Sequence, residues 1–141
     1  MDRRVIICKD LDDPRSFHHP HAVIAGQLIF VSGLVAKRDE VGNVSGTSHA
    51  PDGTITHDVM VQFGSIVETL KQILRDADSD LSMVVDVTVF MSDIKRDFTR
   101  FNASYGTVFG DCLPSRTTVE VSRFPSEVCI ELKVVAMRNN S

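Results

Sequence analysis

Two charged residues near the C-terminus, Arg116 and Glu131, are the residues of this sequence best suited to chemistry. Each lies in a segment in which apolar and polar residues alternate, as in a half-buried strand. A guanidinium can bind a carboxylate through two parallel hydrogen bonds, and a carboxylate can accept and return a proton. The pair therefore predicts a site for a small acid. The alternative, two solvated strand charges, is disfavoured because Val, Met, Thr and Cys surround them.

The segments that carry these two charges predict a β-hairpin. Residues 117–123 and 128–137 have the period of a strand, and a turn containing Pro125 separates them. In the register that places Val121 opposite Ile130, the apolar residues of both strands share one side. The two charges then share the other side, roughly 13 Å apart at the rise of a strand. At that separation they could hold a small acid from its two ends, or each could meet a partner from another subunit.

The composition predicts one soluble domain spanning residues 1–141. A chain of this length can bury a substantial core, and its 43% apolar and 24% charged residues are ordinary for a globular protein. The net charge of −4 disfavours a nucleic-acid partner, which presents many phosphates. No apolar run approaches the ~20 residues of a membrane helix, so no membrane partner is expected.

The N-terminus and the cysteines favour a cytoplasmic location. The chain begins Met1-Asp2-Arg3-Arg4 and continues with only a short apolar run, which is unlike a signal peptide. Cys8, Cys112 and Cys129 are odd in number and widely spaced, without a Cys-x-x-Cys motif. This pattern indicates reduced thiols rather than a disulfide framework or a zinc site.

The order of the expected elements leaves one face of a sheet uncovered. We expect strands at 4–8 and 27–31, a loop at 37–52, a helix from Thr56 to about Ala77, a strand at 84–91, a helix at 95–109 and the C-terminal hairpin. Two helices can cover only one face of the sheet. Val135 and Met137 would remain on the other face, which predicts a homo-oligomer with pockets at the subunit boundaries.

Three histidines, His18, His19 and His21, lie within four residues of each other. A zinc site needs ligands spaced for a tetrahedron, and no second cluster accompanies them, so we expect no metal. The histidines are expected to line a pocket or face solvent. The sequence has no glycine-rich phosphate loop and no other motif that requires a cofactor.

Four motifs, in order and at matching spacing, resemble the RidA (YjgF/YER057c-type) family of imine and enamine deaminases. They are Gly-Gln-Leu-Ile-Phe-Val-Ser-Gly at 26–33, Phe-Asn-Ala-Ser-Tyr at 101–105, Pro-Ser-Arg-Thr-Thr-Val-Glu-Val at 114–121 and Ile-Glu-Leu at 130–132. The resemblance implies an α+β, chorismate mutase-like fold, with a mixed sheet and two helices on one face. It also implies a homotrimer with its sites between subunits.

The resemblance assigns roles to individual residues. Arg116 matches the carboxylate-binding Arg, and Glu131 matches the acid that handles the catalytic water. His19 and Thr118 stand where many members have Tyr and Cys, respectively. The other residues expected to contact a small carboxylate substrate are Ser32, Gly33, Asn102 and His21.

One subgroup, the 2-aminomuconate deaminases, has a similar N-terminal motif. His-Pro-His-x-x-x-Ala-Gly at 19–26 is similar to its Phe-Pro-His-x-x-x-Ala-Gly, and the long 37–52 loop also fits. Val23 and Ile24 depart from it, because that subgroup tends to have basic residues there. We therefore expect an enamine or imine deaminase, with 2-aminomuconate as a candidate substrate. A regulatory protein that binds a metabolite without turnover is the alternative, and the acidic balance disfavours RNA cleavage.

Overall fold

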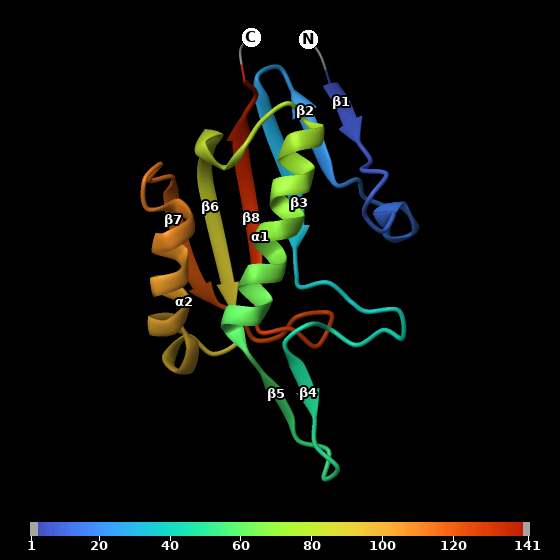
Figure 1. The fold of residues 1–141 in the computed structure, drawn as a ribbon, viewed down its shortest axis with the longest axis vertical. Helices are drawn as coiled ribbons and strands as arrows, with labels where there is room; N and C mark the ends of the chain where they lie inside the picture. Colours follow the sequence, from blue (N-terminus) through green and yellow to red (C-terminus); the bar gives the residue numbers. More distant parts are fainter. Residues whose placement is uncertain (1–2, 140–141) are drawn as a thin grey trace.

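The computed structural model describes residues 3–139 and has the predicted α+β architecture (Figure 1). Its strands are β1 Arg3–Ile6, β2 Ala22–Ala25, β3 Leu28–Leu34, β4 Thr47–His49, β5 Ile55–His57, β6 Val84–Met91, β7 Ser115–Glu120 and β8 Ile130–Met137. Its helices are α1 Val59–Asp76 and α2 Ile94–Phe109, with 3-10 turns at Pro14–Phe17 and Leu81–Met83. Within residues 3–139, neither helix is apolar enough over a sufficient length to cross a membrane.

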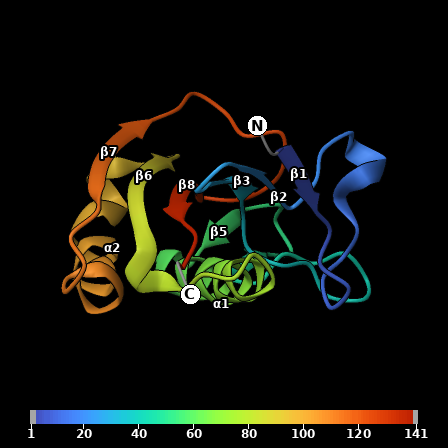
Figure 2. The ribbon, with the colours of Figure 1, turned by 90° about the horizontal axis from the view of Figure 1, so that it is seen from above.

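Six strands form a mixed sheet in the order β1-β2-β3-β8-β6-β7. The strands β1, β2 and β3 form an antiparallel meander, and β8 lies antiparallel between β3 and β6. The edge strand β7 runs parallel to β6, so the chain must cross over between them, and α2 makes that crossover. Figure 2 shows both helices on one side of the sheet, as the sequence predicts.

The predicted hairpin between the two C-terminal strands is wrong. Strand β6 lies between β7 and β8, and residues 121–129 carry the chain past it to the middle of the sheet. The predicted register places the apolar residues of both strands on one side, but in the structure each strand pairs with the apolar β6 instead. The consequence for the two charges is large, because Arg116 lies opposite Val87 whereas Glu131 lies opposite Phe90.

Helix α1 begins later than predicted. Thr56 lies in β5, which pairs with β4, so part of the expected 37–52 loop is a two-stranded hairpin. The cap of α1 is Asp58, whose carboxylate accepts the backbone N–H groups of Met60 and Val61 at 3.0 and 3.2 Å. Helix α2 begins one residue earlier than predicted, after Asp93, whose side chain accepts the N–H of Arg96.

The core lies between the helices and one face of the sheet, and the other face stays open. The apolar side chains of β8 that face the helices, Ile130, Leu132, Val134 and Ala136, are fully buried. On the opposite face, Leu28 pairs with Met137 and Phe30 pairs with Val135, and Leu28, Phe30 and Met137 are each nearly 40% exposed. This uncovered apolar face agrees with the sequence expectation, although the structure describes a single chain.

Candidate functional site

Glu131 lies on the open face of the sheet, with its carboxylate against the backbone of Gly33. A side-chain Cβ at position 33 would lie 2.5 Å from Glu131 Oε2, so only glycine leaves room for the carboxylate in this position. Burial raises the pKa of Glu131 above its ordinary value. No hydrogen bond or salt bridge to a residue within 3–139 stabilises the ionised form of Glu131, so the effect of burial on its pKa is not offset. Such a carboxylate is suited to accept a proton.

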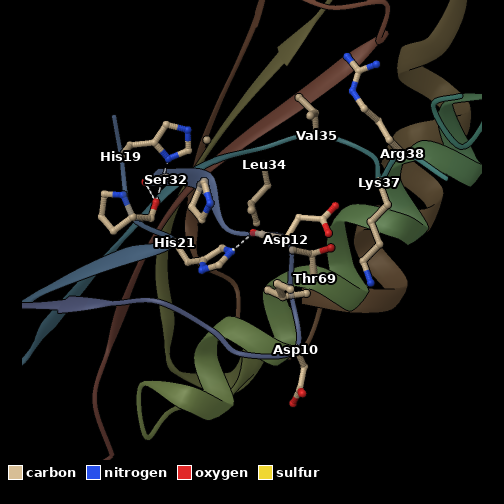
Figure 3. A pocket seen from close by; sticks show the side chains of 14 residues that line it. Asp10, Asp12, His19, His21, Ser32, Leu34, Val35, Lys37, Arg38 and Thr69 are labelled. Carbon is tan, nitrogen blue, oxygen red and sulfur yellow. Dashed lines mark hydrogen bonds between the residues drawn. The ribbon is translucent and has the colours of Figure 1, made fainter. Parts of the chain in front are cut away.

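Gly33 lies at an irregularity in strand β3, where the pairing with β8 shifts between Val31 and Leu34. The neighbouring Ser32 donates its hydroxyl to the carbonyl of Pro20 at 2.7 Å, and its N–H to the carbonyl of His21 at 3.0 Å. These bonds hold the His-Pro-His segment beside Gly33. Ser32, Gly33, His19 and His21 all line one pocket of about 380 Å³ (Figure 3).

The two histidines of this pocket differ in whether their ring nitrogens are already hydrogen-bonded. The Nδ1 atom of His21 accepts the N–H of Cys8 at 2.9 Å, so Nε2 carries the proton and donates to the carbonyl of Asp12 at 2.9 Å. His21 is buried, and both ring nitrogens are engaged by backbone. His19 is exposed, and its Nδ1 contacts the carbonyl of Pro20 at 2.9 Å, while its Nε2 has no hydrogen-bond partner in the part of the chain that the structure describes. His19 is therefore the histidine better placed to meet a ligand.

His18 lies outside this pocket and ends the 3-10 turn at Pro14–Phe17, in a left-handed conformation with φ of 71°. In the part of the chain from 3 to 139, no three His, Cys, Asp or Glu residues are grouped closely enough to hold a metal ion.

Arg116 lies on the opposite, helix-covered face and is held by α2. One of its terminal nitrogens donates to Asn102 Oδ1 at 2.8 Å. Its guanidinium carbon lies 4.6 Å from the centre of the Tyr105 ring and 5.7 Å from that of Phe98. Residues 98, 102 and 105 follow one face of a helix, which explains how one short segment supplies all three contacts. The remaining N–H groups of the exposed guanidinium are available to a carboxylate.

Thr118 follows Arg116 on the same face of β7. It lines a shallow pocket with Arg116, Phe98 and Ile94. Its hydroxyl oxygen is buried without a hydrogen-bond partner among the described residues, and the same holds for the hydroxyl of Tyr105. An unpartnered buried hydroxyl costs free energy, and a ligand bound at Arg116 could accept a hydrogen bond from Thr118.

The structure thus divides the predicted site residues into two groups on opposite faces of the sheet. The acid half-site consists of Glu131, Gly33, Ser32, His19 and His21. The arginine half-site consists of Arg116, Asn102 and Thr118. The expectation that Arg116 and Glu131 share one side of a single chain is wrong, because β6 separates their strands and their side chains alternate to different faces.

Sequence reasoning missed two contributors to the arginine half-site. The helical spacing of Phe98 and Tyr105 is typical of core positions, and Tyr105 is 8% exposed, but both rings also lie close to the Arg116 guanidinium. Their position relative to Asn102 was the available signal, since i, i+4 and i+7 residues share a face. This shared helix face indicates a contact with Arg116 only when β7 is known to lie beside α2.

Comparison with known proteins gives a consistent result. The chain matches a protein-family model described as Endoribonuclease L-PSP over residues 13–138. A RutC family protein from Pyrococcus abyssi is 33% identical over 120 residues, which cover 85% of this chain and 86% of the relative.

Solved structures share the fold. A structure from Thermotoga maritima superposes with a TM-score of 0.77 at 28% identity, over 97% of this chain and 100% of that one. A structure from Mycobacterium tuberculosis, of a member of the YjgF/YER057c/UK114 family, superposes with a TM-score of 0.75 over 96% of this chain and 99% of that one. At 19% identity, the second comparison supports the fold alone.

Proposed function

Because the chain belongs to the YjgF/YER057c/UK114 (RidA, L-PSP) family, we propose that it is a cofactor-independent deaminase acting on the enamine or imine of a small carboxylic acid. The products are the keto acid and ammonia. The observation that carries this proposal is the half-buried Glu131 carboxylate, which lies against Gly33, has no hydrogen-bond partner among residues 3–139 and has a raised pKa. Arg116 supplies the complementary carboxylate-binding group.

The proposed reaction uses these groups in sequence. Arg116 binds the substrate carboxylate, and the enamine tautomerises to the imine. Glu131 takes a proton from a water molecule, whose oxygen forms a bond to the imine carbon. The protonated Glu131 then gives this proton to the nitrogen, which completes a carbinolamine. Glu131 next accepts the proton of the carbinolamine hydroxyl and passes it to the nitrogen, so the carbonyl forms as the carbon–nitrogen bond breaks and ammonia leaves. One water is consumed, and one carbonyl and one ammonia form, without an oxidant or a metal.

A complete site then requires two subunits, since a single chain places the two half-sites on opposite faces of its sheet. We propose a homotrimer in which the acid half-site of one chain meets the arginine half-site of its neighbour. Its assembly would also cover the exposed apolar face.

Light scattering should give a particle of three 15.6 kDa chains at micromolar concentration. Replacing Phe30 by Lys should shift the particle toward monomer, because a charge on the open face resists burial in an interface. Circular dichroism should remain that of the parent, since Phe30 faces away from the core. A monomeric parent protein would contradict the proposed assembly.

The proposed substrate is 2-aminomuconate, on the similarity of the motif at 19–26 to that of the corresponding deaminases. Ammonia release should be faster with 2-aminomuconate than with 2-aminoacrylate or 2-iminobutyrate. Faster release from 2-aminoacrylate would refute this substrate while leaving a deaminase. No release from any of the three would refute the deaminase itself.

Two other functions fit the family. A regulatory protein would keep carboxylate binding at Arg116 and lack turnover, so binding without ammonia release would favour it. RNA cleavage corresponds to the description of the family model, but the net charge of −4 disfavours a phosphate-backbone substrate.

A further inference from the structure

The pocket that His19, His21, Ser32 and Gly33 line, next to the Glu131 carboxylate that contacts Gly33, has a second end, which the proposed reaction does not use. In the view of Figure 3, His19 lies on one side of this pocket, and Lys37 and Thr69, which also line it, lie on the other side. The pocket volume of about 380 Å³ is more than a three- or four-carbon acid needs. The substrate can therefore extend from Gly33 toward Lys37.

The chain fixes Lys37 relative to helix α1. The backbone N–H of Lys37 donates to the hydroxyl of Ser65 at 2.9 Å. Ser65 and Thr69 are four residues apart in α1 and so lie on the same face of the helix. The bond to Ser65 therefore holds the backbone of Lys37 next to the helix face that carries Thr69.

Both polar groups at this end lack partners within residues 3–139. The hydroxyl oxygen of Thr69 is buried without a hydrogen bond, and the ammonium of Lys37 makes no hydrogen bond or salt bridge. An ammonium and a hydroxyl donor that line the same end of a pocket are suited to a carboxylate.

The other charges of the pocket affect this end unequally. Arg38 donates to the carbonyl of Gly42 at 3.1 Å, and Figure 3 shows Arg38 and Asp10 directed away from Thr69. Asp12 also lines the pocket, with its carboxylate exposed. Its negative charge would repel a bound carboxylate and so weaken the attraction between that carboxylate and Lys37. The hydrogen bond that Thr69 can donate does not depend on this charge.

We propose that Lys37 and Thr69 form a subsite for the second carboxylate of an extended dicarboxylic acid, an inference that rests on the proposed deaminase site next to Gly33, at the other end of the pocket. Arg116 of a neighbouring subunit holds the carboxylate next to the reacting carbon. The Lys37–Thr69 subsite then selects dicarboxylates over monocarboxylates of equal length.

Calorimetric binding of adipate and hexanoate to the assembled protein tests this subsite, because the two six-carbon acids differ in the second carboxylate. Replacing Lys37 by Met keeps the unbranched chain and removes the charge, so adipate binding should weaken by about 10-fold while hexanoate binding stays unchanged. Thr69→Val should weaken adipate binding in the same direction, and Asp12→Asn should strengthen it. Lys71→Met, on the same helix but outside the pocket, is the matched control and should change neither affinity.

Equal affinity of the parent protein for the two acids, or an equal loss for both in the Lys37→Met variant, would overturn the subsite. So would absence of measurable adipate binding. These binding measurements do not depend on turnover. A parent protein that releases no ammonia but retains the Lys37-dependent preference for adipate would refute the deaminase and keep the subsite.

Discussion

Replacing Glu131 by Gln should lower the rate of deamination by ~100-fold or more, the scale of general acid–base catalysis. The amide keeps the shape of the side chain but cannot take a proton from water. Carboxylate binding should stay close to that of the parent, since the binding group is Arg116. Ammonia release and calorimetric binding of an unreactive acid measure the two effects separately. A Glu131→Gln variant that deaminates at the parental rate would refute the mechanism.

The pH dependence gives a second readout of the same residue. Burial raises the pKa of Glu131, and catalysis needs its deprotonated form, so activity should be lost as pH falls through that raised pKa. The effect of pH on folding stability has the opposite direction to its effect on activity. A carboxyl group whose pKa is higher in the folded than in the unfolded state favours folding below the unfolded-state pKa, and that contribution declines as pH rises through the folded-state pKa. The Gln variant should therefore unfold at a slightly higher temperature than the parent at neutral pH.

The sequence predicted the helices and strands better than it predicted which strands pair with each other. The periodicity of α1, α2 and β6 identified these segments to within a few residues, because each has a strong apolar pattern. The short strand β2 was missed, and β4 and β5 were read as a loop and a helix start. Their few residues carry little pattern, and their pairing partners decide their conformation.

The predicted C-terminal hairpin failed for a reason that the local sequence does not contain. Strands β7 and β8 match each other in apolar pattern, but β6 is apolar at nearly every position and pairs with both. Its Val87 and Val89 are fully buried under the helices. A central strand with this composition competes for the same partners as a hairpin, and only the tertiary structure shows which pairing wins.

The family was correctly recognised from ordered motifs, whereas the geometry of the site was not. The motifs identify Arg116 and Glu131 one at a time, without the distance between them. Their roles in binding and catalysis stay predictions, and so does the 2-aminomuconate subgroup. What the structure adds is the separation of the two residues on opposite faces of the sheet, which makes an intersubunit site the simplest arrangement that can use both.

Replacing Arg116 by Lys should weaken carboxylate binding by ~1.5–3 kcal/mol, or roughly 10- to 150-fold, the range for hydrogen bonds to charged groups. Lysine keeps the charge but loses the planar fork, and with it the contacts to Asn102 Oδ1 and the Tyr105 ring. Binding of an unreactive acid by calorimetry measures the loss. The exposed Arg123, replaced by Lys in the same way, is the matched control and should leave binding unchanged. Parental affinity in the Arg116→Lys variant would exclude Arg116 as the carboxylate ligand.

Mixing two inactive variants tests whether the site combines residues of two subunits. Chains carrying Glu131→Gln retain Arg116, and chains carrying Arg116→Ala retain Glu131. If a site takes one residue from each neighbour, random co-assembly of the two variants restores both residues at about a quarter of the interfaces. Ammonia release by the refolded mixture should therefore recover to a similar fraction of the parental rate, while each variant alone stays inactive. If the mixture forms intact trimers but is no more active than either variant alone, each site takes both residues from one chain. That result would contradict the intersubunit site inferred from the separation of Arg116 and Glu131 by β6.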